Sequence, residues 1–215
     1  MRSAFDRRVL SDPVLGLVLA CQRRLPCHLG GGAALSGAYL AHRLSRDVDL
    51  FCHQPEHVRS LVRELPEVSR ETGLQVTPVR DAGTFVRCEV RGLVQPLEID
   101  IVLDAPDIEP PPAIEGVVVE SLLDLRAAKL TCLLSRSEPR DLVDLLFLDR
   151  GGYPPELDLS AACRKDAGID PGVLAWLLGQ FPVSPLPVML EPLNETELRR
   201  FRDELRERFK RLALP

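Results

Sequence analysis

The sequence predicts an α+β protein, in which a mixed β-sheet flanked by helices is followed by a helical C-terminal half. Up to residue 119, runs with two-residue apolar alternation are mixed with runs of helical periodicity, whereas only helical periodicity follows. A stretch at residues 104–112, rich in proline and without periodicity, precedes this change. We therefore expect an α+β domain over residues 1–119 and a helical domain over residues 120–215.

Composition excludes several classes of protein. The chain has 215 residues, a net charge of -5, 45% apolar and 27% charged residues, which is typical of a globular protein that does not grip nucleic acid by overall charge. No run approaches the roughly 18 apolar residues of a membrane-spanning helix. The apolar run at residues 14–20 is short for a signal peptide. The six cysteines form no Cys-x-x-Cys pair, so we expect them to be reduced and buried. A cytoplasmic protein without membrane contact is expected.

The first elements place a glycine loop between a strand and a helix. Residues 13–24 are expected to form a helix with proline in its first turn. Residues 27–29 form a short predicted strand that runs directly into Gly30, Gly31 and Gly32. From Ala33 to Leu44 the apolar side chains recur at helical spacing. A glycine loop that opens a helix in this way is typical of anion binding.

The remaining elements follow from the same periodicities. Residues 47–51 alternate as a strand, and residues 55–67 form an amphipathic helix. Further strands are predicted at residues 74–80, 84–90, 93–103 and 116–119. Further helices are predicted at residues 121–135, 138–148, 159–168, 171–181 and 195–212. Asn194 followed by Glu197 is a typical capping pair for the last helix.

Two pairs of acidic residues stand on predicted strands. Asp47 and Asp49 are separated by one residue, so their carboxylates leave the same face of the strand. Glu98 and Asp100 repeat this pattern. If the two strands are neighbours, the carboxylates converge into an oxygen-rich site suited to Mg²⁺ with substrate phosphates. Each pair taken alone is more often a solvated strand face.

The glycine loop followed by acids on two strands resembles the nucleotidyltransferase superfamily that includes DNA polymerase β. More narrowly, the chain resembles the AbiEii-type nucleotidyltransferases, toxin components of bacterial toxin-antitoxin and phage-defence systems. The first match covers residues 29–35, Leu-Gly-Gly-Gly-Ala-Ala-Leu, and residues 43–51, Arg-Leu-Ser-Arg-Asp-Val-Asp-Leu-Phe. The second is a predicted helix that contains Lys129, one of three lysines, followed by Arg136 and by Arg140-Asp141-Leu142-Val143-Asp144. The resemblance spans about residues 28–150.

The resemblance implies roles for the residues of the first match. Gly31 and Gly32 would let the backbone approach the nucleotide phosphates. Asp47 and Asp49 would hold Mg²⁺ on these phosphates, and Ser45 would bind phosphate. Asp100 would be the third acid, which either shares the metal or accepts the proton of an attacking hydroxyl. Glu98 is the neighbouring alternative for that acid.

The second match implies a role for a lysine. Lys129 would neutralise negative charge on the triphosphate. Asp141 and Asp144 lie on one face of the same predicted helix, and which of them faces the site stays open. Asp144 would orient Lys129 or the acceptor, while Arg140 or Arg150 would pair with the other carboxylate. A surface ion-pair ladder is the alternative interpretation of these residues.

The implied reaction is Mg²⁺-dependent transfer of a nucleoside monophosphate from a nucleoside triphosphate to an acceptor hydroxyl. The implied acceptor is the 3' end of a transfer RNA, and the implied role is that of a toxin restrained by a cognate antitoxin protein. Family members usually carry a hydroxyl residue after the glycine pair, where this chain has Ala33. Two alternatives therefore remain. One is a weak or inactive relic that binds nucleotide or protein, and the other is nucleotidyl or phosphoryl transfer to a small molecule or protein.

Other residues give weaker signals. The helix at residues 198–212 is rich in arginine and would suit an RNA backbone, although a solvated helix with glutamate-arginine pairs is the favoured interpretation. His28 and His42 are expected to be structural, and His53 and His57 have less claim still to a catalytic role. Trp176 is expected to pack in the core.

Overall fold

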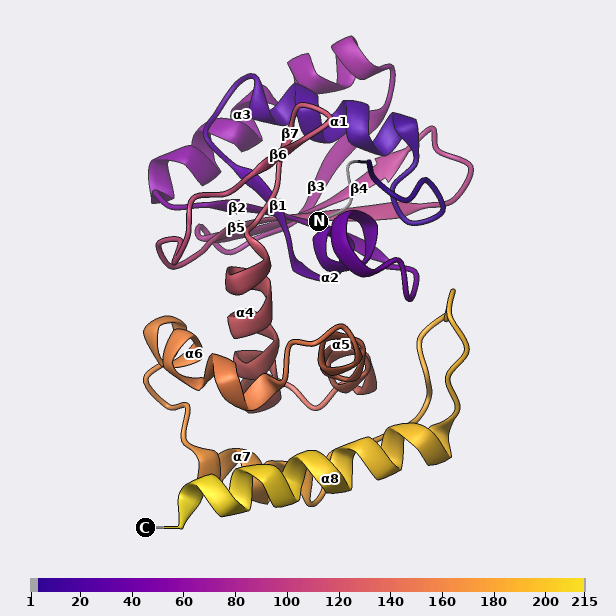
Figure 1. Ribbon diagram of the computed structural model, residues 1–215. Helices are drawn as coiled ribbons and strands as arrows, with labels where there is room; N and C mark the ends of the chain where they lie inside the picture. Colours follow the sequence, from indigo (N-terminus) through magenta and orange to yellow (C-terminus); the bar gives the residue numbers. More distant parts are fainter. Residues whose placement is uncertain (1–3, 215) are drawn as a thin grey trace. The chain divides into compact units, whose positions relative to one another are not determined.

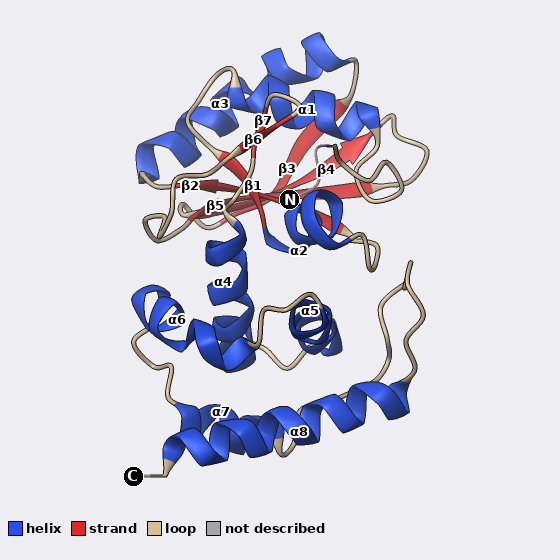
Figure 2. Ribbon diagram, viewed as in Figure 1, coloured by secondary structure: helices blue, strands red, loops and turns tan. Residues whose placement is uncertain are grey.

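A computed structural model of the chain describes residues 4–214 (Figures 1 and 2). The described residues up to Ser121 form one compact unit, and those from Leu122 onward form a second. A mixed sheet with helices occupies the first unit, and the second is helical. The predicted fold class is therefore confirmed. The assignment of residues 1–119 and 120–215 to separate functional domains stays a prediction.

The first unit is built on a five-stranded sheet in the order β1-β2-β5-β4-β3. Strands β2 and β5 run parallel, and the other three neighbouring pairs run antiparallel. The strands are β1 (His28–Gly30), β2 (Asp47–Cys52), β3 (Gln75–Asp81), β4 (Phe85–Arg91) and β5 (Leu97–Leu103). The helices of this unit are α1 (Asp12–Gln22), α2 (Gly31–Ala34), the π-helix η1 (Leu35–Leu40) and α3 (Pro55–Thr72).

Side-chain alternation gives the sheet an apolar and a polar face. On β2, Val48 and Leu50 are buried, whereas Asp47 and Asp49 are partly exposed. Helices α1 and α3 cover the apolar face, and α2 lies on the opposite side of the sheet (Figure 1). The acidic side chains of β2 therefore share a face with the glycine loop that opens α2.

One predicted helix ends earlier than its periodicity indicates. The helix expected from Ala33 to Leu44 ends at Leu40 in the π-helix η1, and Ala41 adopts the left-handed conformation with φ of 54°. Ser36 explains this end. Its carbonyl accepts the Ala41 N–H at 2.7 Å, and its hydroxyl donates to the Arg43 carbonyl at 2.5 Å. The chain therefore turns back toward the sheet before β2.

Helix α3 continues beyond its predicted end at residue 67. Pro66 lies inside the helix, but Leu65 and Val68 on either side of it are buried in the core. Burial of this apolar face offsets the backbone hydrogen bond that proline removes. The helix ends at Gly73, whose φ of 69° is typical of a glycine C-cap.

A two-stranded hairpin follows the proline-rich loop, where a single strand was predicted. It consists of β6 (Ala113–Ile114) and β7 (Val117–Val118). Beyond β7, Val119 forms a parallel bridge with Leu29, and the Glu120 N–H donates to the Leu29 carbonyl at 2.8 Å. This segment therefore runs beside β1 and brings Glu120 to the glycine loop.

The second unit consists of helices arranged around α4. Helix α4 contacts α5, α6 and α7, and α7 packs along α8. The elements are α4 (Leu122–Ser135), α5 (Pro139–Arg150), the 3₁₀-helix η2 (Pro155–Asp158), α6 (Leu159–Lys165), α7 (Pro171–Leu178) and α8 (Glu195–Ala213). Asn194 caps α8 as predicted, because its Oδ1 accepts the Glu197 N–H at 3.0 Å. Helices α6 and α7 end a few residues before their predicted ends.

Two expectations about burial are wrong. Trp176 on α7 is 67% exposed instead of packing in the core, because the buried side of that short helix is formed by Leu174 and Leu178. Of the six free cysteines, Cys163 is exposed and Cys132 is partly exposed.

Among residues 4–214, no helix combines the length and the apolar character needed to cross a bilayer.

Candidate active site

The acidic side chains of β2 and β5 meet in register on the polar face of the sheet. Asp49 is the direct Cα partner of Asp100, and Asp47 is the partner of Glu98. Asp100 is buried, with 4% exposure, while the other three acids are partly exposed. The sequence predicted that these carboxylates converge if the two strands are neighbours, and the pairing of β2 with β5 meets that condition.

The glycine loop lies directly against one of these carboxylates. Gly30 is the Cα partner of Asp49, and Gly31 follows with a φ of 64°. A Cβ placed on Gly31 would lie 1.9 Å from the Asp49 Oδ2, a distance that no side chain tolerates. Both the backbone angle and the contact therefore require glycine at position 31.

Gly32, Ser45 and Asp47 form the adjoining part of the site. A Cβ on Gly32 would lie 2.6 Å from the Arg43 Nη2 and 3.3 Å from the Ser45 Oγ. The Ser45 hydroxyl in turn donates to the Asp47 Oδ1 at 3.3 Å. The guanidinium of Arg43, a residue with 2% exposure, thus places a buried positive charge against the loop. The glycines, the serine and the β2 acids are brought together as one surface.

A further carboxylate, not predicted from the sequence, approaches the same loop. Glu120 is fully buried, and its Oε2 accepts the Gly31 N–H at 3.4 Å. At least one amide of the loop is therefore directed at a protein carboxylate. Ala33, which follows the glycines, is also fully buried. The loop consequently owes its shape to contacts with Asp49, Arg43 and Glu120.

Asp100 is held by an arginine on the next strand. The Arg87 Nε donates to Asp100 Oδ1 at 2.8 Å, and Nη2 donates to Oδ2 at 2.7 Å. The Arg87 Nη1 also lies 3.2 Å from the Glu98 Oε2. The pKa of Arg87 is raised, mainly by its hydrogen bonds to Asp100, so its guanidinium stays charged. The sequence did not reveal this partner, because only the pairing of β4 with β5 places Arg87 opposite Asp100.

The residues of the second match form a separate cluster within the helical unit. The Lys129 Nζ lies 2.7 Å from Asp144 Oδ2 and 3.2 Å from Asp141 Oδ1. Arg136 donates two hydrogen bonds to the Asp141 carboxylate, from Nε to Oδ2 at 2.8 Å and from Nη2 to Oδ1 at 2.9 Å. Lys129 is 3% exposed, and both acids are fully buried. Both carboxylates therefore face the lysine, so the cluster is a buried ion-pair network.

The predicted partners of these acids differ from those observed. Arg136, from the loop between α4 and α5, pairs with Asp141, whereas Arg140 pairs with Glu138. Arg150 reaches Glu197 at the start of α8. The arginine seen on Asp141 is thus Arg136, and the pairing of Arg140 or Arg150 with Asp141 or Asp144 stays a prediction.

Burial and charge oppose each other at Asp141. Burial alone would raise the pKa of its carboxyl, but Lys129 and Arg136 more than compensate, so the pKa is held below its ordinary value of 3.8. Asp141 is therefore ionised at neutral pH.

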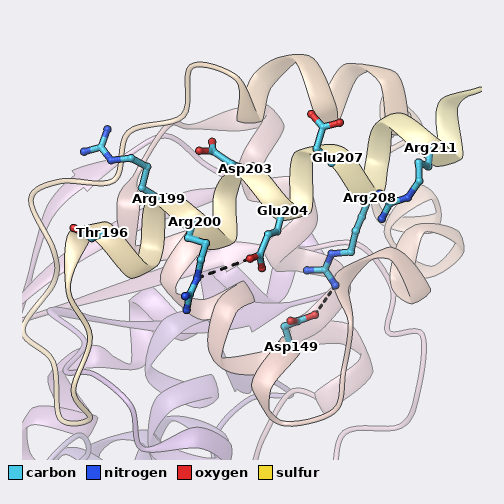
Figure 3. A pocket seen from close by; sticks show the side chains of 9 residues that line it. All are labelled: Asp149, Thr196, Arg199, Arg200, Asp203, Glu204, Glu207, Arg208 and Arg211. Carbon is cyan, nitrogen blue, oxygen red and sulfur yellow. Dashed lines mark hydrogen bonds and ion pairs between the residues drawn. The ribbon is translucent and has the colours of Figure 1, made fainter.

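The groove along α8 contains none of the predicted site residues (Figure 3). Arg200 lies 3.8 Å from Glu204, and Arg208 lies 2.7 Å from Asp149. Lys210 is paired with Glu207 in the same way. These pairs are typical of a solvated helix and give the predicted RNA track on α8 no support.

Carboxylates at the sheet fit a hard divalent cation. Asp47 and Asp49 offer oxygen ligands on one face, which Mg²⁺ prefers over nitrogen. The Asp49 carboxylate lies directly against Gly31, so a cation held by Asp49 would lie at the glycine loop. Both carboxylate oxygens of Asp100 accept hydrogen bonds from Arg87, which fix the orientation of this carboxylate.

Solved structures with this fold cover nearly the whole chain. A Helicobacter pylori protein described as a nucleotidyltransferase matches with a TM-score of 0.60 and 20% identity, over 94% of this chain and 95% of its own. JHP933 from Helicobacter pylori matches with a TM-score of 0.56 and 22% identity, over 95% of this chain and 94% of its own. The nucleotidyltransferase toxin MenT4 from Mycobacterium tuberculosis matches with a TM-score of 0.57 and 16% identity, over 93% of this chain and 85% of its own.

Sequence comparison identifies the family. The chain has no significant match among curated proteins. Residues 18–215, however, match the family model described as nucleotidyl transferase AbiEii toxin, type IV toxin-antitoxin system. This match extends beyond residues 28–150, on which the resemblance was based, and confirms it. The chain belongs to the AbiEii family of nucleotidyltransferase toxins.

Proposed function

We propose that this nucleotidyltransferase toxin uses Mg²⁺ to transfer a nucleoside monophosphate from a nucleoside triphosphate to the 3' hydroxyl of a transfer RNA. A cognate antitoxin protein would restrain it in the cell. The transferase chemistry and the toxin role are those of the family. The metal, the acceptor and the residue roles are the proposal.

One observation carries the proposal: the direct approach of the glycine loop to the paired strands β2 and β5. Gly31 leaves no room for a side chain beside Asp49, and Asp49 lies opposite Asp100. A phosphate chain over Gly31 would thus meet carboxylates that bind a divalent cation. Ser45 offers a hydroxyl at the same edge.

The site residues have distinct roles in this mechanism. Asp47 and Asp49 would hold Mg²⁺, which when bound neutralises charge on the phosphates and on the developing pyrophosphate. Gly31 and Gly32 let the triphosphate approach the strand. The acceptor hydroxyl oxygen forms a bond to the α-phosphorus while the bond to the bridging oxygen breaks, and pyrophosphate leaves. The hydroxyl proton must also be removed.

Asp100 is the third acid of the proposed site. It either shares the cation or accepts the hydroxyl proton. In both cases Arg87 keeps the carboxylate plane fixed by two charge-assisted hydrogen bonds. Glu98, with 47% of its side chain exposed and one 3.2 Å contact to Arg87, is less constrained. We therefore assign the third acid to Asp100.

The role that the family resemblance implies for Lys129, neutralisation of charge on the triphosphate, is part of the proposal. Its ammonium is held by Asp141 and Asp144 in a fixed place. Asp144 makes the shorter contact, at 2.7 Å, and is the residue that orients the lysine. Arg136 balances the remaining charge of Asp141. The network thus presents a lysine with little freedom to move.

The experiment that tests the proposed reaction identifies both the transferred group and the acceptor. The full chain is incubated with Mg²⁺, total tRNA and each α-labelled nucleoside triphosphate in turn, and in parallel with the γ-labelled forms. Label from the α-position at the 3' end of tRNA is expected. Label in protein or in a small molecule would show that the acceptor is not tRNA. Transfer of the γ-label alone would show that the reaction is phosphoryl transfer and not nucleotidyl transfer.

A second candidate function is favoured by Ala33 and by Glu120 at the loop. Without a hydroxyl after the glycines, one phosphate hydrogen bond is missing, which costs about 1 to 3 kcal/mol if nothing replaces it. The chain would then bind nucleotide without turnover. This candidate predicts that the chain binds nucleotide in equilibrium dialysis but transfers no label in the assay above. Ala33→Ser would then restore transfer if the hydroxyl is what is missing.

A further inference from the structure

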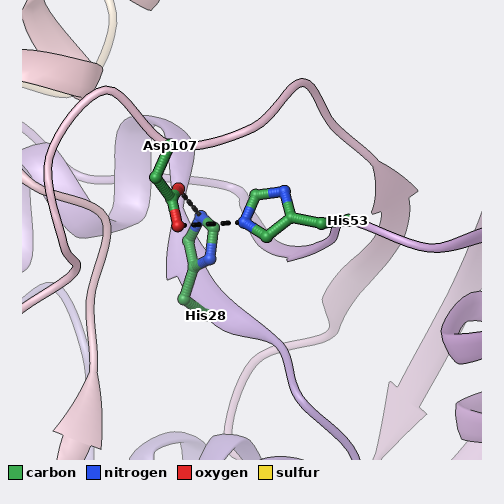
Figure 4. A group of neighbouring side chains, drawn as sticks. All are labelled: His28, His53 and Asp107. Atoms are coloured by element: carbon green, nitrogen blue, oxygen red, sulfur yellow. Dashed lines mark hydrogen bonds and ion pairs between the residues drawn. The ribbon is translucent and has the colours of Figure 1, made fainter.

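Three potential metal ligands meet in the first unit, in a cluster separate from the paired carboxylates (Figure 4). His28 is the first residue of β1, His53 follows β2, and Asp107 lies in the proline-rich loop after β5. The His53 Nε2 lies 3.0 Å from Asp107 Oδ2, and the His28 Nε2 lies 3.8 Å from Asp107 Oδ1. One ligand atom from each residue lies within 4.8 Å of the other two. We propose that this cluster binds one divalent transition-metal ion, with Zn²⁺ as its occupant.

The separations suit a shared ion. Ligand atoms about 2.0 to 2.1 Å from a tetrahedral Zn²⁺ lie roughly 3.3 Å from one another. The two distances from Asp107, 3.0 and 3.8 Å, stand on either side of that value. The two distances end on different oxygens of the Asp107 carboxylate, and a bound ion would draw together three donors that lie within 4.8 Å of one another. The fourth position is left for water.

The donor set separates this site from the one proposed for Mg²⁺. Two imidazoles with one carboxylate favour Zn²⁺ and other late first-row ions, whereas sites made of carboxylates alone favour Mg²⁺. Asp47 and Asp49 are of the second kind. The chain thus offers two cation sites that differ in preferred metal.

Burial gives the cluster a rigid base and an open side. The His28 side chain is 4% exposed, while those of Asp107 and His53 are 21% and 34% exposed. The His28 ring packs edge-on against Phe51, with centroids 5.8 Å apart, and lies 5.2 Å from the His53 ring. An ion would therefore enter from the side of His53 and meet a histidine already fixed by the sheet.

The ion would tie three chain segments together next to the glycine loop. His28 stands two residues before Gly30, and a Cβ on Gly30 would lie 2.2 Å from the ring of Phe51. Phe51 thus contacts both His28 and the glycine loop. Metal at His28, His53 and Asp107 would fix the proline-rich loop to the ends of β1 and β2. The proposed role is structural support of the nucleotide loop.

The test measures Zn²⁺ directly on the purified full chain. The protein is stripped with a chelator and dialysed against Zn²⁺ in the presence of excess Mg²⁺, and bound metal is quantified by mass spectrometry. We expect one Zn²⁺ per chain and a higher melting temperature than for the stripped protein. His53→Gln and Asp107→Asn, at the more exposed ligands, should each weaken binding by at least about tenfold. His57→Gln, at a histidine outside the cluster, is the matched control and should bind as the parent does.

Two results would overturn the proposal. One is the absence of Zn²⁺ from the dialysed parent chain, and the other is an unchanged affinity in His53→Gln and Asp107→Asn, which would assign the metal to cysteines or other residues. Asp49→Asn separates this inference from the proposed reaction. It should abolish nucleotidyl transfer and leave Zn²⁺ binding intact, so the two proposals fail independently.

Discussion

Asp49 and Asp100 lie opposite each other across the parallel strands β2 and β5, yet their neighbours differ. The glycine loop approaches Asp49 so closely that a Cβ on Gly31 would lie 1.9 Å from its carboxylate oxygen. Asp100 instead has both oxygens bound by Arg87. The two acids are thus adapted to different tasks, with Asp49 beside the phosphate loop and Asp100 fixed in orientation.

Replacing Gly31 with alanine should abolish nucleotide transfer. The new Cβ would collide with Asp49, and the backbone φ of 64° is strained for any residue other than glycine. We expect transfer to fall by at least about a hundredfold, because displacement of a reacting group by an ångström has effects of that size. The measurement is the initial rate of α-label transfer.

Gly73→Ala is the matched control for Gly31→Ala. Gly73 has a similar φ of 69°, but nothing lies within 4 Å of the position of its Cβ. It should lose stability through backbone strain and retain transfer. Equal loss of transfer in both variants would show that strain, and not the contact with Asp49, governs activity.

Arg87→Ala should lower the rate of transfer by more than any loss of folded protein explains. The change removes both hydrogen bonds to Asp100, which then loses its fixed orientation. We expect kcat to fall by about tenfold or more. Arg91→Ala, on the same strand and paired with the exposed Glu89, is the control. An unchanged kcat in Arg87→Ala would make Asp100 a structural residue.

The sequence predicted the acidic residues better than their partners. Two-residue alternation placed Asp47, Asp49 and Asp100 on one face of strands, since that period follows from local backbone geometry. Arg87 could not be found in this way, because its role depends on which strand pairs with β5. Periodicity likewise did not predict where η1 ends. There Ser36 turns the chain by hydrogen bonds to residues farther along the sequence than its helical neighbours.

The cluster at His28 shows the same limit of sequence reasoning. His28 and His53 lie on neighbouring antiparallel segments but are 25 residues apart in the sequence. Asp107 is farther along the chain still. No spacing typical of a metal site joins these residues. Only the pairing of β1 with β2 and the path of the loop after β5 bring them together.

Lys129→Ala should destabilise the helical unit as well as weaken nucleotide binding. The change leaves Asp144 and Asp141 buried without the lysine, and breaking a buried pair in this way costs about 3 to 5 kcal/mol. Lys210→Ala, at a pair on the surface of α8, should cost about 1 kcal/mol or less. Urea unfolding monitored by circular dichroism measures both. Equal stability of the two variants would contradict the network observed here.

Stability of the helical unit should fall in acid. The pKa of Asp141 is lower in the folded chain than its ordinary value of 3.8, because Lys129 and Arg136 outweigh its burial. A group of this kind contributes stability above its unfolded pKa and loses it as the pH falls through the folded pKa. The protection factors of the α4 and α5 amides, which correct for the pH dependence of intrinsic exchange, should therefore fall below about pH 4. Asp141→Asn should show a flatter dependence in this range, and an identical profile would contradict the assignment.

The paired carboxylates at the glycine loop are the central claim, and Asp49→Asn tests it most directly. This change keeps the shape of the side chain and removes its charge, while Glu67→Gln on the surface of α3 serves as the control. The measurement is transfer of α-label from nucleoside triphosphate with Mg²⁺ and total tRNA. We predict that transfer is lost in Asp49→Asn, with an unchanged melting temperature, and retained in Glu67→Gln. Undiminished transfer by a folded Asp49→Asn variant would contradict the account.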